Sequence, residues 1–323
     1  MNKVIKDSSK LFHNVAVLGA NGFLGSHVVD ALVARGHKVN AFDNFASGSV
    51  RFASSPLVQK ISGDFFNPTD LTAALAGSDT VIHLVSATTP VSAEADPTLD
   101  IQQNLLGSVA LFRQCAATST INRVVFASSG GTVYGSSEVA LLSETAPVHP
   151  VSPYGICKLA TEHYLAFFAV TAGLSSVSLR ISNPYGDRQP LQRRQGVIPV
   201  FIENLLQGFP VLVYGDGSMV RDFIHISDVA AAFVAVVEAA QPQHGVYNVG
   251  SGMGESVLDV LAAVAAAVGT EPVVKYQPTP LSFVPSAVLD TARFRSEFAW
   301  APQVNLTNGI ADTVAYVRRA LAG

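Results

Sequence analysis

The sequence predicts an α/β fold, a doubly wound parallel sheet followed by a smaller, mixed α/β C-terminal part. Short β-branched runs alternate with helical patterns through the first half of the chain. A glycine-rich turn joins the first run to the first helix, and proline and glycine interrupt the chain after about residue 183. Strands that alternate with helices form parallel sheets covered on both faces. A chain of 323 residues can hold two modest domains.

Six strands are expected before residue 183, over 15–18, 38–42, 58–61, 80–84, 123–127 and 176–181. Helices are expected over residues 24–35 and, between the fourth and fifth strands, over 99–117. We place one domain at residues 1–183 and a second at 184–323. Segments within about 223–250 (223–240 and 246–249) are expected to return to the first domain and its sheet.

Composition excludes several classes of function. The chain is 49% hydrophobic and 14% charged, against roughly 25% charged in an average domain, which indicates a large core. A net charge of −4 gives no basic surface for nucleic acid or anionic membrane. No apolar run reaches the roughly 20 residues of a membrane span, and the first residues carry no signal-peptide pattern. Cys115 and Cys157 show no disulfide or ligand spacing, so we expect a reduced, cytoplasmic protein.

The turn Gly19-Ala20-Asn21-Gly22-Phe23-Leu24-Gly25 predicts a dinucleotide site of the Rossmann type. Its glycines allow a tight turn, a close approach to a pyrophosphate and close helix–strand packing. The following helix N-terminus offers free N–H groups to phosphates. Asp43 ends the second strand, where it can accept hydrogen bonds from both ribose hydroxyls and repel a 2′-phosphate. An acidic residue at this position therefore selects NAD over NADP.

The alternative is that these glycines only turn the chain and Asp43 only caps a loop. Agreement of strand, glycines, helix and acid favours the cofactor site. Asp64 could meet the adenine edge, or it could merely form an Asx turn. The full set of expected cofactor contacts is Gly19, Gly22, Phe23, Leu24, Gly25, Asp43, Asn44, Asp64, Phe65, Leu84, Ser86, Tyr154 and Lys158. The residues 1–183 therefore form the expected NAD-binding domain.

The segment Ser152-Pro153-Tyr154-Gly155-Ile156-Cys157-Lys158 carries the candidate chemistry. Ser152 is a good N-cap and Pro153 a good first helical residue, so a helix is expected to begin here. Tyr154 and Lys158 then lie one turn apart on one face. Tyrosine is a poor base at neutral pH, but a nearby lysine, the helix N-terminus and a nicotinamide cation all favour its phenolate form.

A serine-rich strand end, Phe126-Ala127-Ser128-Ser129-Gly130-Gly131-Thr132-Val133-Tyr134-Gly135, lies upstream. It falls at the carboxyl edge of the sheet, where ligands of open α/β sheets bind. A hydroxyl there can share the substrate's proton with Tyr154. Taken alone, Tyr154 and Lys158 could be an ordinary helix face. Their place after a fitting dinucleotide turn favours catalysis. The histidines form no metal-binding cluster, and His83 and His225 are expected to be satisfied core or loop residues.

Together these residues resemble the extended short-chain dehydrogenase/reductase family, and its UDP-glucose 4-epimerase-like (NAD-dependent epimerase/dehydratase) branch in particular. The resemblance runs from about His13 to Val317. It rests on the motifs GANGFLGSH, DNF, GDFF, HLVSATTP, SSGGTVYG, SPYGICK, LRISNPYG, QGVIPVF and YGDGSMVRDFIHISDVA. The glycine turn and YxxxK are shared across the superfamily. The later motifs indicate nucleotide-sugar members.

The resemblance implies a role for each matching residue. Tyr154 is the base, and Lys158 holds the nicotinamide ribose and favours the tyrosine anion. Asn183 binds the substrate near its phosphates, Arg221 pairs with the pyrophosphate, and Asn104 supports the active-site geometry. Residues 197–201, beginning at Val197, and Tyr214 border the uridine. The resemblance also implies a homodimer, built by helices 99–117 and 153–171, and a role in surface-polysaccharide synthesis.

Three positions depart from the family pattern. Gly130 stands where the best-known epimerases have a serine or threonine, so Ser129 is the candidate hydroxyl and Thr132 the second. Pro280 stands where a second pyrophosphate arginine is common, a role that Arg193, Arg194 or Arg293 could take. Ala287 stands where a residue gates N-acetylated sugars, and its small side chain keeps UDP-GlcNAc and UDP-GalNAc possible.

Dehydratases of the family use an Asp-Glu pair where this chain has Gly131 and Thr132, which counts against dehydration and against decarboxylation. We therefore expect NAD-dependent 4-epimerisation of a UDP-hexose through a transient 4-keto sugar. The second hypothesis is a nucleotide-sugar dehydrogenase/reductase with exchangeable NAD, or a dehydratase-like enzyme. The third is a non-catalytic dinucleotide sensor, which the intact Tyr154 and Lys158 disfavour. The substrate-binding domain is then residues 184–323.

Overall fold

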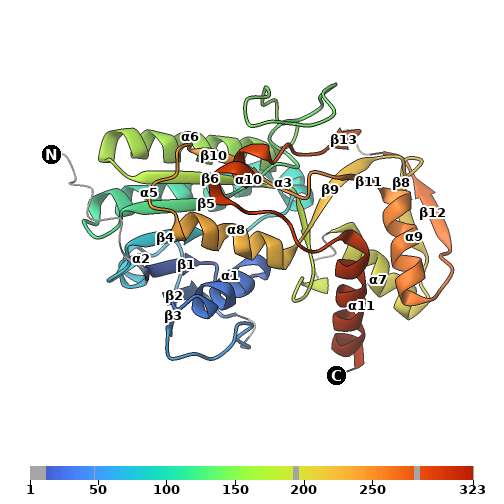
Figure 1. Ribbon diagram of the computed structural model, residues 1–323, viewed down its shortest axis with the longest axis horizontal. Coiled ribbons are helices and arrows are strands. Elements are labelled where there is room, and N and C mark those ends of the chain that lie inside the picture. Colours follow the sequence, from blue (N-terminus) through green and yellow to red (C-terminus); the bar gives the residue numbers. More distant parts are fainter. Residues whose placement is uncertain (1–11, 47, 192–195, 280–283, 323) are drawn as a thin grey trace.

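A seven-stranded parallel sheet organises the larger part of the molecule, at the left and centre of Figure 1, and most of its strands are coloured blue to green. The computed structural model describes residues 12–46, 48–191, 196–279 and 284–322. The strand order is β10-β6-β5-β4-β1-β2-β3, and every pairing in it is parallel. The strands are β1 (Asn14–Leu18), β2 (Lys38–Asp43), β3 (Val58–Ser62), β4 (Thr80–His83), β5 (Arg123–Ser129), β6 (Ser175–Ile181) and β10 (Val246–Val249). This confirms the predicted fold class.

Helices cover both faces of the sheet, which is why its central strands are buried along almost their whole length. One face packs on α1 (Phe23–Ala34), α8 (Ile226–Glu238) and α10 (Ala292–Phe298). The other face packs on α2 (Pro68–Leu75), α5 (Gly107–Ala117) and α6 (Pro153–Ala172). Every residue of β4 is buried, as are six of the seven in β5.

The helix expected over 99–117 is not a single α-helix. It consists of α4 (Pro97–Asp100), a π-helical segment η1 (Ile101–Leu106) and α5, preceded by α3 (Pro90–Ala95). Asn104 lies in the π segment. Its amide nitrogen donates to Asp100 Oδ1 at 2.6 Å, and its amide oxygen accepts from the backbone N–H of Ala87 at 2.9 Å. The helix thus widens where a side chain ties it to the loop after β4, and such bulges often occur at functional sites.

The smaller part lies beside the sheet, at the right of Figure 1. Three helices and a two-stranded parallel sheet share one apolar cluster. The elements are α7 (Val197–Gln207), α9 (Val257–Val268), α11 (Leu306–Ala322), β8 (Val211–Tyr214) and β12 (Val274–Gln277). A third sheet connects this region to the larger part. Its strands are β7 (Asn183–Tyr185), β9 (Val220–His225), β11 (Gly254–Ser256) and β13 (Ser286–Ala287).

The segments expected to return to the main sheet do so only in part. β10 joins its edge beside β6, and α8 packs against α1 on one face. The start of the 223–240 segment is different: β9 pairs with β7, β11 and β13 in the separate sheet. Residues 220–249 thus supply one strand to each of two sheets, β9 and β10, which a strand pattern alone cannot resolve. Within the described ranges, no helix is both long and apolar enough to cross a bilayer.

Candidate active site

The glycine turn after β1 lies where the strand order of the sheet reverses direction. β1 has β2 on one side and β4 on the other, and ligands of open α/β sheets bind in the crevice at such a point. Gly19 follows β1 directly. A Cβ atom placed on it would lie 3.2 Å from the backbone of Leu84 and Val85, after β4. The glycine turn and the loop after β4 therefore close on each other at the carboxyl edge.

The glycine turn has the geometry that a pyrophosphate needs. Gly19 has φ +84°, and a Cβ on Gly25 would lie 2.0 Å from the Gly19 carbonyl oxygen, so only glycine fits. Gly22 is the N-cap of α1 and provides no side-chain cap. The first-turn N–H groups of Phe23 and Leu24 therefore lack that usual partner and, with the positive end of the helix dipole, suit a phosphate.

Asp43 ends β2 beside this turn. Its carboxylate accepts the backbone N–H groups of Asn21 at 2.9 Å and Asn44 at 2.8 Å. Each oxygen keeps lone-pair capacity for a ribose hydroxyl. The side chain of Asn44 is engaged locally, because its oxygen accepts from the N–H of Ala46. This arrangement fits a dinucleotide whose adenosine ribose reaches the end of β2.

Other expected cofactor residues are placed nearby but act locally here. Asp64 accepts from the N–H of Phe66 at 3.0 Å, the Asx-turn geometry of the alternative interpretation. Phe65 is buried and stacks on the His83 ring, with centroids 5.4 Å apart. Leu84 follows β4, and its N–H donates a hydrogen bond to the Leu18 carbonyl oxygen. The Ser86 hydroxyl donates to the Thr88 carbonyl oxygen.

The N-terminus of α6 presents the candidate catalytic pair. As the sequence predicts, Ser152 caps the helix, accepting from the N–H of Gly155 at 3.2 Å, and Pro153 follows. The Lys158 ammonium lies 5.4 Å from the centre of the Tyr154 ring and 4.8 Å from that of Phe126. It donates to the Ala127 carbonyl oxygen at 2.9 Å. The lysine is thus held between α6 and β5.

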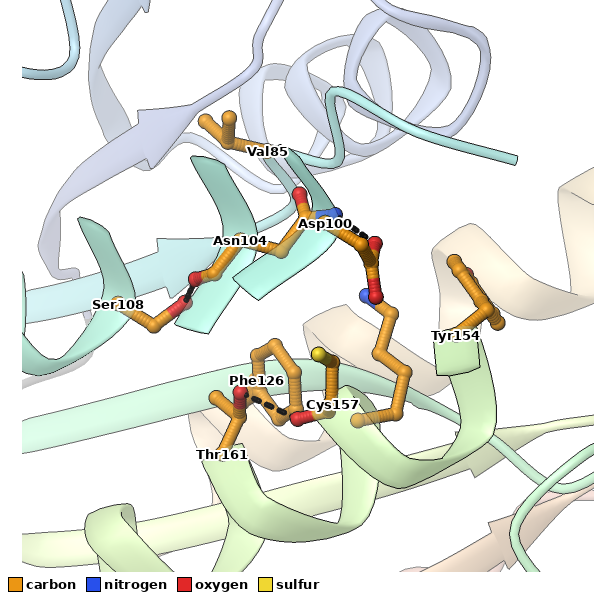
Figure 2. Close-up of a pocket in the computed structure, with 9 residues that line it drawn as sticks. Val85, Asp100, Asn104, Ser108, Phe126, Tyr154, Cys157 and Thr161 are labelled. Atoms are coloured by element: carbon orange, nitrogen blue, oxygen red, sulfur yellow. Dashed lines mark hydrogen bonds between the residues drawn. The ribbon is translucent and has the colours of Figure 1, made fainter. Parts of the chain in front are cut away.

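A small cavity lies beside this pair, and Figure 2 shows α6 residues facing the π-helical segment across it. Its walls include three polar residues that sequence reasoning did not select: Asp100, Cys157 and Thr161. Asp100 is completely buried and binds the Thr88 hydroxyl and Asn104. Burial, with the neighbouring Asp100, raises the pKa of the Cys157 thiol to about 12, so this cysteine is not a nucleophile. The four-residue spacing of Asp100 and Asn104 was the available signal.

The expectation for His83 and His225 was half right. Both are buried; His83 bonds the Ser108 hydroxyl, and His225 Nδ1 bonds both the hydroxyl and the backbone N–H of Ser227. Each also has a ring nitrogen without a partner, so neither is fully satisfied. Burial and the charge of Lys158 lower the pKa of His83 to about 3. This imidazole is therefore neutral.

The serine-rich loop leaves a hydroxyl at the end of β5. Ser129 is the last residue of that strand and is half-buried. A Cβ on Gly130 would lie 2.5 Å from a methyl carbon of Leu289, which explains why no serine occupies that position. Thr132 Oγ1 is buried and has no hydrogen-bond partner. The hydroxyl function therefore has Ser129 as its nearest candidate and Thr132 as a second.

Some of the expected substrate residues lie on the sheet that connects the two parts, and the others lie on the smaller part. Asn183 begins β7 and donates to the Asp222 carbonyl oxygen at 2.9 Å. Arg221, on the neighbouring β9, donates to the carbonyls of Val220 and Val284, and burial lowers its pKa to about 10. Ala287, on β13, is buried and stands beside Arg221. Val197 begins α7, and Tyr214 ends β8 with its side chain partly exposed.

Of the three arginines proposed as a second pyrophosphate ligand, the structure describes Arg293 alone. Pro280, Arg193 and Arg194 lie outside the described residues. Arg293 lies 3.5 Å from the Glu144 carboxylate and donates to the Val246 carbonyl, so its guanidinium already has partners. In the part of the chain that the structure describes, no group of three His, Cys, Asp or Glu side chains could hold a metal ion.

Comparison with known proteins gives one consistent result. The NAD dependent epimerase/dehydratase family matches residues 15–250. The chain is 36% identical to the UDP-glucose 4-epimerase of Mycolicibacterium smegmatis, over 94% of this chain and 97% of that protein. The Thermus thermophilus UDP-glucose 4-epimerase, solved in complex with NAD, superimposes with a TM-score of 0.87 at 36% identity, covering 95% of this chain and 99% of that one. A UDP-N-acetylglucosamine 4-epimerase from Methanobrevibacter ruminantium, solved with UDP-N-acetylmuramic acid, gives 0.88 at 30% identity over the same shares.

Proposed function

This chain belongs to the NAD-dependent epimerase/dehydratase family, and from that premise we propose that it interconverts the 4-epimers of a UDP-hexose. One observation carries the proposal. Tyr154 and Lys158 stand together at the carboxyl edge of the sheet, where the glycine turn also lies. UDP-glucose with UDP-galactose is the first substrate pair to test. The likeness to a UDP-N-acetylglucosamine 4-epimerase makes the N-acetylated pair the second.

The cofactor is NAD, and three features of the fold fit it. The close-packed glycine turn approaches a pyrophosphate, the uncapped start of α1 faces its charge, and Asp43 receives ribose hydroxyls. Bound NAD supplies the hydride acceptor and donor. The protein contributes the proton transfer, the orientation of the sugar and the anchoring of its diphosphate.

In our proposal Tyr154 takes the proton of the sugar 4-hydroxyl and later returns it. Lys158 stabilises the phenolate through its positive charge and holds the nicotinamide ribose. Ser129 shares a hydrogen bond with the reacting hydroxyl, with Thr132 as the second candidate. General acid–base transfer of this kind contributes about 10²- to 10⁴-fold in rate. The remaining residues that we assign to the cofactor are Gly19, Gly22, Phe23, Leu24, Gly25, Asp43, Asn44, Asp64, Phe65, Leu84 and Ser86.

Anchoring of the diphosphate must persist while the 4-keto hexose turns over. We assign it to Asn183 and Arg221, whose strands β7 and β9 pair. A guanidinium suits this role because its fork meets phosphate oxygens in pairs. Val197 and Tyr214 are the proposed borders of the uridine. Arg221, Val197 and Tyr214 come from residues 184–323 and Asn183 directly precedes them, which supports treating 184–323 as the substrate domain.

The loop chemistry disfavours dehydration. Elimination of water needs a carboxylic acid and a base near the reacting carbons. Gly131 and Thr132 follow Ser129 and Gly130, and none of these carries a carboxylate. A hydroxyl, a tyrosine and a lysine support reversible oxidation at one carbon, which is what epimerisation requires.

We also propose a homodimer in the cytoplasm. Helix α6 and the π-helical segment that precedes α5 carry exposed apolar side chains, which an interface would cover; they are Leu106, Tyr164, Phe167 and Val170. Neither cysteine forms a disulfide and both are buried, in keeping with a reducing compartment. Supply of UDP-hexoses for surface polysaccharides is the proposed role.

The test is to mix the protein separately with UDP-glucose and UDP-GlcNAc, without added NAD, and to follow the anomeric NMR signals. We expect a galacto product from at least one. Net NADH formation with no epimer would instead support the dehydrogenase. Inertness toward both sugars, beside turnover of another, would reject the proposed substrates.

A further inference from the structure

Three side chains follow one another on a single face of α6. Tyr154, Lys158 and Glu162 are each four residues apart, which places them one turn from each other. Lys158 and Glu162 are both buried, at 7% and 5% exposure. Opposite charges at this spacing attract, and burial strengthens the attraction. Lys158 nevertheless donates to the Ala127 carbonyl oxygen of β5.

The Glu162 carboxylate is engaged by Arg180 of β6. The Arg180 Nε atom lies 3.0 Å from Glu162 Oε1, and Nη2 lies 2.7 Å from Oε2, so the pair is bidentate. The Ser128 hydroxyl also donates to Oε1. Burial opposes charge on Arg180, but the hydrogen bonds and charge of Glu162 raise its pKa. Arg180 therefore stays charged inside the protein, opposite the Glu162 carboxylate.

Arg180 is itself held in place. It pairs in register with Ser128 across β5 and β6, two strands of the same parallel sheet. Its guanidinium lies 4.9 Å from the centre of the Tyr134 ring, and the Tyr134 hydroxyl donates to Asn248 Oδ1 at 2.6 Å. The arginine can therefore hold the carboxylate in one fixed position.

We propose that Arg180 is a positioning residue for the reaction: by binding Glu162 it prevents that carboxylate from pairing with Lys158. The inference rests on the roles proposed above for Tyr154 and Lys158. Without Arg180, the buried carboxylate has the Lys158 ammonium one turn away as a replacement partner. Lys158 would then turn from Ala127 and from the nicotinamide ribose, and its charge would no longer act on Tyr154.

The test compares kcat and KM of three variants, each corrected for bound NAD. Arg180→Met releases the Glu162 charge, and we expect kcat to fall about 100-fold, as for a displaced catalytic group. The KM for the UDP-sugar should change less than about threefold, because Asn183 and Arg221 are untouched. Glu162→Gln alone removes the carboxylate that could pair with Lys158, so kcat should fall less than about fivefold.

The double variant R180M/E162Q decides the matter. Removing the carboxylate as well should restore kcat to within about tenfold of the wild type, so the double variant is faster than R180M. A double variant as slow as R180M, or slower, overturns the proposal, because Arg180 would then act only by packing. So does a loss that appears in KM with kcat unchanged.

Two controls separate this outcome from others. Arg123→Met removes a different buried arginine. Arg123 begins β5, at the opposite end of that strand from Ser129, so kcat should be unchanged. If R180M does not fold, R180K takes its place, and R180K/E162Q must then be faster than R180K; a double variant as slow as R180K overturns the proposal. Failure of Tyr154→Phe to lose activity would reject the proposed base, whereas the order of R180M and the double variant tests Arg180 alone.

Discussion

The polar groups at the two ends of the main sheet, where its strands begin (the amino edge) and where they end (the carboxyl edge), differ in how fully they are hydrogen-bonded. At the amino edge, Arg123 donates to the carbonyls of Val236 and Val237 in the last turn of α8 and of Ala240 just after it. Asp79 there accepts from His13 and from the backbone N–H of Asn14. At the carboxyl edge, His83 Nδ1, Thr132 Oγ1 and Ser182 Oγ are buried without a partner. Buried polar groups normally find partners. One edge therefore stabilises the fold, while the other keeps hydrogen-bonding capacity for ligands.

Replacement of Tyr154 should give the largest effect and should touch activity alone. For Tyr154→Phe we expect kcat to fall by about 10³-fold or more, since the phenol is the proposed proton acceptor. Bound NAD and the melting temperature should stay at wild-type values. Kinetics, NAD extraction and calorimetry check this. Tyr164→Phe, on the exposed side of the same helix, is the matched control. A near-normal rate in the Tyr154 variant would remove this residue from the mechanism.

Replacement of Arg123 should show the opposite behaviour at the amino edge. Arg123→Met leaves the last carbonyls of α8 without their donors and should lower the free energy of unfolding by about 3 kcal/mol. Activity per folded molecule should stay within about twofold, because no site residue contacts Arg123. Urea denaturation and kcat at a permissive temperature measure both. A large loss of kcat in folded protein would contradict the division between the edges.

Gly25→Ala should affect cofactor binding more than folding. The added methyl group meets the Gly19 carbonyl oxygen at 2.0 Å, so the turn must open. Loss of one hydrogen bond to a charged phosphate costs about 1.5–3 kcal/mol, which weakens NAD binding roughly 10- to 150-fold. Titration with NAD, or the NAD content of purified protein, shows the loss. Gly245→Ala is the control, since its nearest neighbouring atom would be 3.9 Å away. Equal NAD content in both variants would contradict the proposed turn.

Acid should destabilise the protein through its buried histidines. The effect of His37, at the amino edge, should be smaller than that of His83, at the carboxyl edge. Burial lowers the pKa of His37, where Glu238 opposes the shift, and lowers that of His83 to about 3. The unfolded chain therefore binds protons first below about pH 6.5, and stability falls as pH decreases. At pH 5 the share from His83 is about 2 kcal/mol. Denaturation at pH 6.5 and 5 should show a smaller decrease for His83→Gln than for His37→Gln. An unchanged decrease in His83→Gln would contradict this.

Prediction from sequence succeeded where one local segment determines the conformation. The glycine turn, the Ser152 cap and the Pro153 start of α6 are formed within a few residues, and the structure has each of them. The family, the fold class and the NAD cofactor agree with the comparisons. The π-helical segment was missed because Asn104 widens the helix through contacts with Ala87 and Thr88, which are distant in sequence. The division of residues 223–240 between two sheets depends on pairing partners in the same way.

The sequence by itself determined which chemical groups this protein has: a glycine turn with no room for side chains, an acid at the end of β2, and a tyrosine and a lysine one helical turn apart. Those follow from local backbone geometry and from the period of the helix. Only the tertiary structure decided which charges meet. Glu162 is paired with Arg180 of another strand, and Lys158 with a carbonyl of β5. The physical reason is that Coulomb attraction and desolvation depend on distance and burial in space, which residue spacing along the chain does not specify.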